Sequence, residues 1–293
     1  MAAPMCCWPR RRTCWASSTR ATPASCTAAR WWGPSRSPST PASPPFNKLA
    51  ARQALNYAID RHRVIALNGG PLTAQPTCQI LPPTMPGYQP YCPYTLHTSP
   101  GGAWRAPDLA RAQQLVRTSG TRGDKVTVPA ITSGYGAGLA TAHYLVSVLD
   151  RLGYRASVRL FTNPFAYGPF TSDSRDRPQL SFIPWLQDYP APYDFIGPLF
   201  TCASFVPDST ANLNAAEFCD PRIDAQVRQA LTLQAQDLAA PADLWTTIDH
   251  ELTDQAPWVP LDNPRDLTVL AARVGNYQFH PYWNLLIDQL WVR

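Results

Sequence analysis

The sequence predicts a mixed α/β fold, and three observations support this prediction. Residues 125–160 hold two stretches of alternating apolar residues on either side of a segment with helical spacing, which is the pattern of a β–α–β unit. Other segments with helical spacing occur before and after this unit. The 293 residues are 45% hydrophobic, so the chain can bury a core. Its 32 prolines and 15% charged residues indicate many loops and a surface with few charges.

The first part of the globular sequence should contain two helices separated by a long irregular segment. Apolar residues share one face over 49–64, which predicts a helix. Residues 65–103 are rich in turn-forming residues and should form an irregular excursion over the surface. The second helix should have Pro107 as its first residue and Gly120 as its stop signal, because proline suits the first helical turn and glycine the end of a helix.

The central β–α–β unit is the clearest pattern. Residues 125–131 alternate as a strand, residues 139–152 follow helical spacing up to Gly153, and residues 154–160 alternate again. Two strands joined through a helix in this way are expected to lie parallel in one sheet.

The remaining sequence predicts a third strand, two further helices and two short β stretches before an aromatic-rich tail. The third strand should lead into a turn-rich stretch, and the sequence has no internal repeat. These elements are expected at 180–185, 223–236, 241–255, 258–261 and 267–270.

Residues 1–45 differ from the rest of the chain. They contain no Leu, Ile or Val, so they cannot bury enough aliphatic surface to offset the entropy lost on ordering, and we expect them to be disordered. Their composition, dominated by Ala, Pro, Arg, Ser, Thr, Cys and Trp, is what GC-rich DNA yields when it is read in a wrong frame. We therefore interpret this leader as frameshifted or non-native. A genuine disordered, arginine-rich tail is the alternative.

The positive charge of the chain lies in this leader. Six arginines and no acids give it a charge of +6, and the other 19 basic and 20 acidic residues give −1, which together make the net +5. Because phosphate binding needs basic residues gathered on a folded face or a functional tail, the near-neutral remainder argues against a nucleic-acid partner. No run of 18 apolar residues could span a membrane, and residues 13–18 lack the apolar core of a signal peptide.

Four cysteines outside the leader, Cys78, Cys92, Cys202 and Cys219, allow three pairings. Proximity in sequence favours Cys78 with Cys92 and Cys202 with Cys219, each disulfide closing a loop of about 15 residues and stabilising the fold by on the order of 3 kcal/mol. Such bonds persist in an oxidising compartment. Four buried free thiols are the alternative. A zinc site is disfavoured because the cysteines form no C-x₂-C pair and no histidine lies close enough in sequence to give a recognisable ligand spacing.

No residue pattern indicates catalysis, a metal site or a cofactor. The five histidines are scattered, and His250-Glu251 lacks the second histidine of a helical zinc-protease motif. The sequence contains no nucleophile elbow, P-loop or dinucleotide fingerprint. We therefore expect a protein without enzymatic activity, metal or cofactor.

Four motifs carry a resemblance to a known family. In chain order they are Pro45-Phe46-Asn47, the run RQALNYAIDR at 52–61, Trp185-x-x-Asp188-Tyr189-Pro190 and Trp258-Val259-Pro260-Leu261. Over residues 45–293 the sequence resembles the bacterial solute-binding proteins of family 5, which include the oligopeptide and dipeptide receptors of ABC importers. The order of the motifs is more specific than any single one of them.

The resemblance implies a lobe of the periplasmic-binding-protein type II fold, with a mixed sheet and flanking helices, in an incomplete two-lobe architecture. Residues 46–258 would form the second lobe, and residues 259–293 would return to the first lobe, the rest of which is absent. The resemblance also implies a location outside the cytoplasm, a short peptide or similar small solute as ligand, binding by lobe closure, and an ABC permease in the membrane as partner.

The resemblance further implies where the ligand binds. An acid at the position of Asp188 anchors the N-terminal ammonium of a peptide in better-known members of the family, a role that suits a charge-assisted hydrogen bond. Trp185 and Tyr189 would supply flat apolar walls. Judged from the residues alone, Asp188 could instead cap a turn and Trp185 could pack in the core.

Other functions stay open at this point. A secreted α/β hydrolase would need a nucleophile and a base that no motif provides. A non-functional fragment would lack the half of the cleft that faces the site. Members of the resembling family also bind nickel, haem, sugars or opines, so a peptide is the commonest implication and one of several.

Overall fold

The computed structural model describes residues 24–28, 37–38, 43–132, 137–176, 178–265, 267–280 and 284–293. Its helices are α1 (Leu49–Ala58), α2 (Arg61–Leu67), α3 (Leu109–Ser119), α4 (Leu139–Leu152), α5 (Pro164–Ser172), α6 (Pro192–Phe200), α7 (Pro221–Gln234) and α8 (Ala242–Gln255), with 3₁₀ turns η1 (Cys202–Ser204) and η2 (Ile287–Gln289). Its strands are β1 (Ala24–Ala28), β2 (Ser37–Pro38), β3 (Ala74–Pro76), β4 (Lys125–Ile131), β5 (Arg155–Phe161), β6 (Phe182–Ile183), β7 (Asp262–Pro264), β8 (Leu267–Ala271), β9 (Val274–Gly275), β10 (Phe279–His280), β11 (Asn284–Leu285) and β12 (Trp291–Val292).

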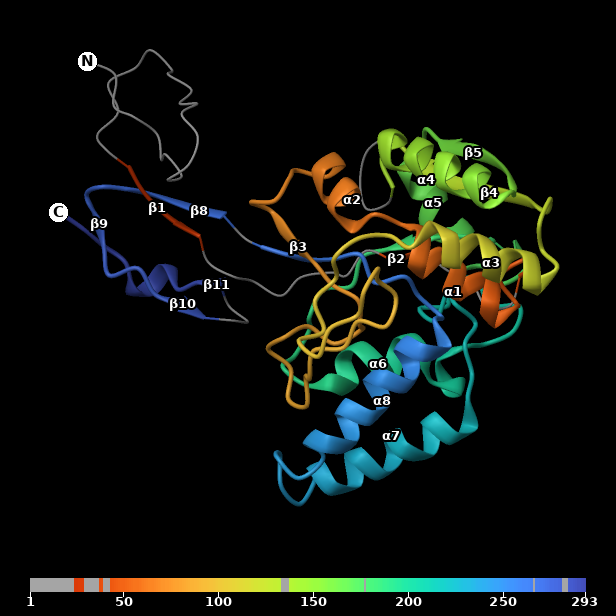
Figure 1. Ribbon diagram of the computed structural model, residues 1–293. Helices are drawn as coiled ribbons and strands as arrows, with labels where there is room; N and C mark the ends of the chain where they lie inside the picture. The colour runs from red at the N-terminus through yellow and green to blue at the C-terminus, as the bar shows by residue number, and fades with distance from the viewer. Residues whose placement is uncertain are drawn as a thin grey trace, which may run out of the picture.

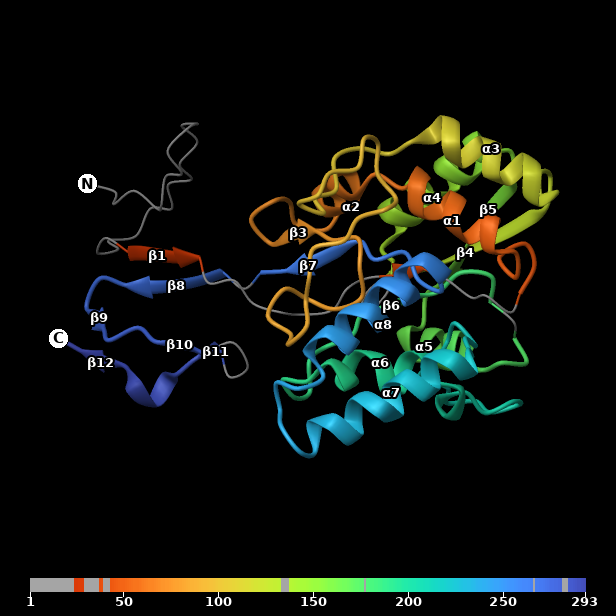
Figure 2. The same cartoon turned by 60° about the horizontal axis from the view of Figure 1, so that its bottom comes forward.

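These elements form two groups with a C-terminal extension beside them. Helices α1, α3 and α4 lie with β4 and β5, and α6, α7 and α8 form a second group below them in Figure 1. The strands β8–β12 lie with β1 to one side of this body, and β7 leads toward them (Figure 2). The mixed α/β architecture is the one that the sequence predicts.

The predicted β–α–β unit is confirmed. Strands β4 and β5 pair in parallel, from Lys125 opposite Arg155 to Ile131 opposite Phe161. Helix α4 connects them and ends at Gly153, whose φ of +96° is a left-handed conformation that favours glycine.

The single helix predicted for 49–64 is wrong, because two helices, α1 and α2, occupy this region. Ile59 and Asp60 between them are extended, and the Asp60 carboxylate accepts a hydrogen bond from the backbone N–H of Arg63 at 3.1 Å. An N-cap of this kind starts a new helix. The break between α1 and α2 is therefore explained by the Asp60 cap, which the spacing of apolar residues does not show.

The boundaries of other predicted elements shift as well. Helix α3 begins at Leu109 after an N-cap by Asp108, so Pro107 is not its first residue, but it ends at Gly120 as predicted. The strand predicted at 180–185 is reduced to β6, and the β stretch predicted at 258–261 is replaced by β7, which pairs with β3.

Helices α5 and α6 are not predicted by the sequence pattern. Each has a proline in its first turn and a second proline inside, at Pro169 and Pro198. Internal proline removes a helical hydrogen bond and is read as a helix breaker. Helix α6 forms nevertheless, and seven of its nine residues are buried, so packing offsets the loss.

Most of the predicted leader, residues 1–45, lies outside the described residues. Within it, β1 pairs antiparallel with β8, and β2 pairs with β6. These short stretches are strands where the sequence predicts disorder. Backbone pairing with a neighbouring strand requires no aliphatic side chain, which accounts for the difference.

Two hydrophobic clusters correspond to the two groups of helices. The first contains buried residues of α1, α3, α4 and β4, such as Leu55, Val128 and Leu149. The second contains residues of α6, α7 and α8, such as Phe200 and Trp245. Each group therefore has an apolar interior of its own.

The motifs at 52–61 and 258–261 contact one another. Asn56 Nδ2 donates to the carbonyl of Trp258 at 3.1 Å. The Arg61 guanidinium is fully buried and donates to the carbonyls of Pro260 at 3.1 Å and Thr77 at 2.9 Å. Burial lowers the pKa of Arg61 to about 9. These two motifs thus join the start of the globular chain to the segment that enters the C-terminal strands.

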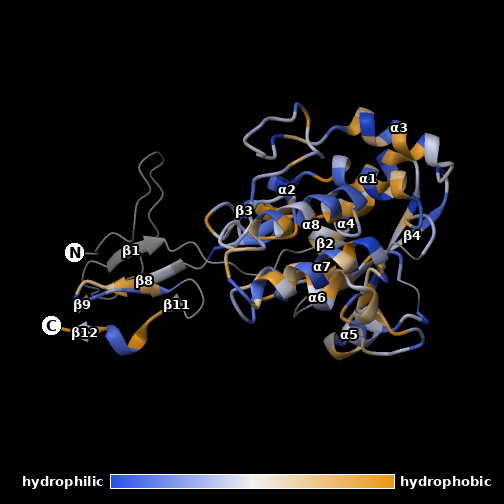
Figure 3. Cartoon of the chain, turned by 90° about the horizontal axis from the view of Figure 1, so that it is seen from below, coloured by the Kyte–Doolittle hydropathy of each residue, from blue (hydrophilic) through white to orange (hydrophobic). Residues whose placement is uncertain are grey.

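The C-terminal extension leaves apolar side chains on its surface. Val269, Ile287 and Val292 are 56%, 75% and 63% exposed. Figure 3 shows hydrophobic stretches on β8 and close to the C-terminus. Across the part of the chain that the structure describes, no helix combines the length and hydropathy needed to cross a bilayer.

Candidate ligand site

The segment after β6 lines an open cavity of about 380 Å³. Trp185, Asp188 and Tyr189, the three residues predicted to bind ligand, all lie on this cavity. Trp185 is half-buried, whereas Asp188 and Tyr189 are exposed. The structure thus places the three predicted residues at one hollow, between the end of β6 and the start of α6.

Helix α6 provides a second wall of the cavity. The ring of Tyr193 lies directly against Gly197 and leaves no room for a side chain there. The Thr201 hydroxyl donates to the carbonyl of Gly197 at 2.6 Å, and the Ser204 hydroxyl donates to the carbonyl of Thr201 at 2.7 Å. This close packing fixes the end of α6 and the turn that follows it.

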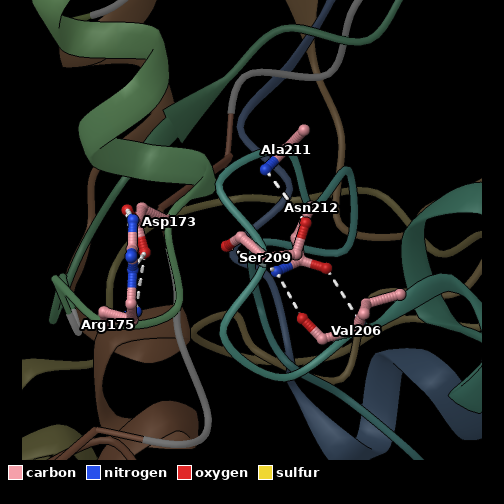
Figure 4. Close-up of polar contacts among 6 residues, drawn as sticks. All are labelled: Asp173, Arg175, Val206, Ser209, Ala211 and Asn212. Carbon is pink, nitrogen blue, oxygen red and sulfur yellow. Dashed lines mark hydrogen bonds and ion pairs between the residues drawn. The ribbon is translucent and has the colours of Figure 1, made fainter.

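The loop between Cys202 and Cys219 closes the cavity on a further side, where Leu213 lines it. A disulfide joins the two cysteines across 17 residues of sequence. Inside the loop, Asn212 Oδ1 accepts from the backbone N–H of Val206 at 2.8 Å, and its Nδ2 donates to the carbonyl of Val206 at 3.0 Å (Figure 4). The disulfide therefore fixes the two ends of the loop, and the hydrogen bonds of Asn212 stabilise its middle.

This loop is also tied to α5. The backbone N–H of Asn212 donates to the carbonyl of Ser172 at 3.0 Å, and the N–H of Ser174 donates to the carbonyl of Ser209 at 3.3 Å. Beside these contacts, Arg175 and Asp173 form a partly exposed ion pair (Figure 4). The walls of the cavity are consequently held by contacts from several parts of the chain.

Asp194 is a residue of the cavity that the sequence analysis missed. It lies in the first turn of α6 and is 1% exposed, and its Oδ2 accepts a hydrogen bond from the backbone N–H of Asp188 at 3.0 Å. Burial raises the pKa of Asp194 to about 6; the negative charge of Asp188 adds to this rise, while N–H groups from Asp188 and Tyr189 oppose it. An acid two residues after the proline that starts the helix is the sequence signal that could have found it.

The charges on the cavity favour a cationic group. Its lining includes the carboxylates of Asp188 and Asp194 and the rings of Trp185, Tyr189 and Tyr193, and no lysine, arginine or histidine is among the described residues on it. Carboxylates next to aromatic faces can hold an ammonium group through charge-assisted hydrogen bonds and cation–π attraction.

The other cysteines pair away from this cavity. The structure joins Cys78 to Cys92, with Cα atoms 5.0 Å apart, inside the excursion at 65–103. The four cysteines thus pair as their proximity in sequence favours. Among the residues with described positions, no cluster of three or more His, Cys, Asp or Glu side chains could hold a metal ion.

An open cavity lined by aromatic rings and a few polar groups is the kind of site at which proteins bind small molecules. The model of the family "Bacterial extracellular solute-binding proteins, family 5 Middle" matches residues 32–206, which is more than half of the chain. The chain belongs to this family.

Curated relatives of the chain include peptide-binding proteins. It is 26% identical to di/tripeptide-binding protein 4 of Pseudomonas aeruginosa over 216 residues. This alignment covers 73% of the chain and 37% of the relative. The chain is 24% identical over 247 residues to the probable ABC transporter periplasmic-binding protein SapA of Escherichia coli, covering 83% and 41%. The chain therefore spans about two fifths of the length of these relatives.

Solved structures of binding proteins have a fold similar to that of this chain. Clavulanic acid biosynthesis oligopeptide binding protein 2 matches with a TM-score of 0.77 at 24% identity, covering 90% of the chain and 47% of that protein. The periplasmic binding protein DppA of Helicobacter pylori, solved with the peptide STSA, matches with a TM-score of 0.73 at 19% identity, covering 92% and 49%. The chain has the α/β fold of about half of such a protein.

Proposed function

We propose that this chain is part of the substrate-binding component of an ABC importer and that it binds short peptides without catalysis. The observation that carries the proposal is the cavity at Trp185, Asp188 and Tyr189, with two carboxylates and no basic side chain among its described lining residues. The names of the relatives, which include di/tripeptide-binding proteins, support a peptide as ligand. A permease in the membrane would receive the ligand.

In this proposal Asp188 binds the N-terminal ammonium of the peptide, and Trp185 and Tyr189 flank its first residues. Asp188 is exposed and lines the cavity, so a ligand that enters the cavity would lie next to this residue. An ammonium held there would gain a charge-assisted hydrogen bond, and a ligand without a positive group would not.

We further propose that residues 46–258 form the second lobe of a two-lobed receptor and that residues 259–293 return to the first lobe. The contact between the motifs at 52–61 and 258–261 supports a boundary at this point, because the chain enters and leaves the two helix groups there. The exposed apolar residues of the C-terminal strands are consistent with a further layer over them.

The proposed location is outside the cytoplasm. The family is described as extracellular, one relative is named as periplasmic, and both disulfides would persist in an oxidising compartment.

The proposal is tested by titrating the ¹⁵N-labelled chain with millimolar Ala-Ala and N-acetyl-Ala-Ala. We expect the free dipeptide to shift the indole signal of Trp185 and the amide signals of Asp188 and Tyr189, and we expect the acetylated dipeptide to leave them in place, because it lacks the ammonium. The variant Asp188→Asn should lose the response. Asp243→Asn, at an exposed position of α8, should keep it.

Equal responses to both dipeptides would contradict the role of Asp188, and no response to either would contradict peptide binding at this cavity. The same samples, analysed for free alanine after prolonged incubation, test the absence of catalysis. Release of alanine above the level of a protein-free control would favour a hydrolase.

A further inference from the structure

Asp194 holds the turn that presents Asp188. Its Oδ2 accepts the N–H of Asp188 at 3.0 Å, and the backbone N–H of Tyr189 acts on the same carboxylate and lowers its pKa. Both N–H groups belong to residues that line the cavity, while Asp194 itself is 1% exposed. A buried carboxylate that accepts backbone N–H groups fixes the conformation of the turn that donates them.

The groups around Asp194 do not neutralise its charge. The titratable side chains beside it are Asp188 and Tyr189 of the preceding turn and Tyr193 of its own helix. Thr201 and Ser204, which line the cavity beyond α6, are neutral. Asp224 of α7 does not line the cavity, and its carboxylate accepts from the N–H of Cys202 at 3.2 Å. Ionised Asp194 therefore adds negative charge to a cavity that already carries Asp188.

We propose that Asp194 is a pH-dependent positioning residue: its ionised form fixes the Asp188–Tyr189 turn and attracts a cationic ligand, and its protonated form does neither. The ligand part of this inference rests on the proposed function, whereas the fixing of the turn does not. Asp194 acts through the backbone of Asp188 and through its charge, and it needs no direct contact with the peptide.

Protonation of Asp194 would change the site between pH 5 and pH 7. Burial and the charge of Asp188 raise the pKa of Asp194 to about 6, so the side chain changes from mostly protonated to mostly ionised between pH 5 and pH 7. A dipeptide ammonium, with a pKa near 8, stays charged throughout this range. If binding requires ionised Asp194, affinity for Ala-Ala should rise by about tenfold from pH 5 to pH 7.

The first test needs no ligand. In ¹H–¹⁵N spectra of the ¹⁵N-labelled chain, the amide proton of Asp188 should move downfield with a midpoint near pH 6, because an ionised acceptor makes a stronger hydrogen bond. Asp194→Asn keeps an oxygen acceptor but cannot titrate, so this step should vanish. Asp108→Asn changes a carboxylate that caps α3 away from the cavity and should leave the step unchanged.

The second test measures Ala-Ala affinity at pH 5, 6 and 7 for the same three proteins. Wild type and Asp108→Asn should bind about tenfold more tightly at pH 7 than at pH 5, and Asp194→Asn should show a nearly flat profile. A flat profile in the wild type, or the same slope in Asp194→Asn, would refute the effect on binding.

The two tests separate this inference from the proposed function. If Ala-Ala binds to none of the proteins while the amide of Asp188 still titrates through Asp194, the proposed function fails and the positioning role stands. If Ala-Ala binds but the amide of Asp188 does not titrate between pH 5 and pH 7, or titrates equally in Asp194→Asn, the inference about Asp194 is wrong. The wild-type titration alone decides this second case, even if the variant does not fold.

Discussion

Asp249 is a fully buried acid that fastens the excursion at 65–103 to α8. Its Oδ1 accepts the backbone N–H groups of Ile80 at 3.0 Å and Leu81 at 3.1 Å, and its Oδ2 accepts from Gln79 Nε2 at 2.6 Å. Burial raises the pKa of Asp249 to about 6, although these three donors act in the opposite direction. Ionisation of this side chain in the folded protein therefore costs free energy.

We expect Asp249→Asn to be destabilising, and most strongly at low pH. The variant keeps one acceptor oxygen but turns an NH₂ group toward the amide of Gln79, which loses a buried hydrogen bond at a cost of about 1–3 kcal/mol. Because the folded pKa of Asp249 lies above its unfolded value, its contribution to wild-type stability is complete below about pH 4 and is lost as pH rises through about 6.

The difference in unfolding free energy between wild type and Asp249→Asn should therefore shrink from pH 4.5 to pH 7. Urea titrations at these pH values measure it. Asp243→Asn, on the exposed side of α8, provides the control and should differ little from wild type at either pH. A difference that grows with pH would mean that Asp249 is stabilised as a carboxylate.

For single residues, the sequence draws attention to those that belong to a motif. It does not show which side chains the fold buries. The family resemblance at the W-x-x-D-Y-P motif selects Trp185, Asp188 and Tyr189, and all three line the cavity, while their contact with a ligand stays a prediction. Asp194 and Asp249 have no motif of their own. Asp194 accepts a backbone N–H from the preceding turn, and Asp249 accepts N–H groups from a loop far away in sequence. Composition and spacing do not show these contacts.

Among the elements, the β–α–β unit was the most predictable because its periodicity and its glycine agree. The spacing of 139–152 is helical, and Gly153 follows at the point where a left-handed residue ends the helix. The break between α1 and α2 and the whole of α5 and α6 could not be predicted in the same way. The break depends on an aspartate cap, and α6 depends on packing around an internal proline and on burial in the second hydrophobic cluster.

Gly153→Ala should destabilise this unit. The backbone there has φ of +96°, and an added Cβ would lie 3.0 Å from the Arg122 side chain, so both conformation and space oppose the methyl group. We expect a loss of about 1–2 kcal/mol of unfolding free energy, measured by urea denaturation. Gly168→Ala in α5 is the matched control, since its Cβ would meet nothing within 4 Å, and it should be neutral or slightly stabilising. Equal losses for the two variants would contradict this account.

At the scale of the whole molecule, the chain spans only part of the length of its relatives. This limits the number of ligand contacts that it can supply. It covers 37% to 42% of the curated relatives that it matches. Two-lobed binding proteins surround their ligand from both lobes, so on the proposal that residues 46–258 form one lobe, these residues alone should bind a ligand weakly.

We expect this chain alone to bind Ala-Ala with a dissociation constant near millimolar, about −4 kcal/mol of binding free energy. A chain extended by a first lobe should bind the same dipeptide far more tightly. Isothermal titration of both measures the difference. Submicromolar binding by the present chain would show that the cavity at Asp188 is sufficient by itself.

The C-terminal strands affect the solubility of the protein. Among the residues that the structure describes, strands β9 to β12 form two-stranded pairs whose outer backbone edges pair with no third strand, and the side chains of Val269, Ile287 and Val292 are exposed in the same extension. Open edges beside apolar side chains act as templates for strand addition by another molecule. Concentrated solutions of this chain should accordingly self-associate through the last 27 residues, 267–293, and removal of this segment should improve solubility while the cavity at Asp188 stays intact.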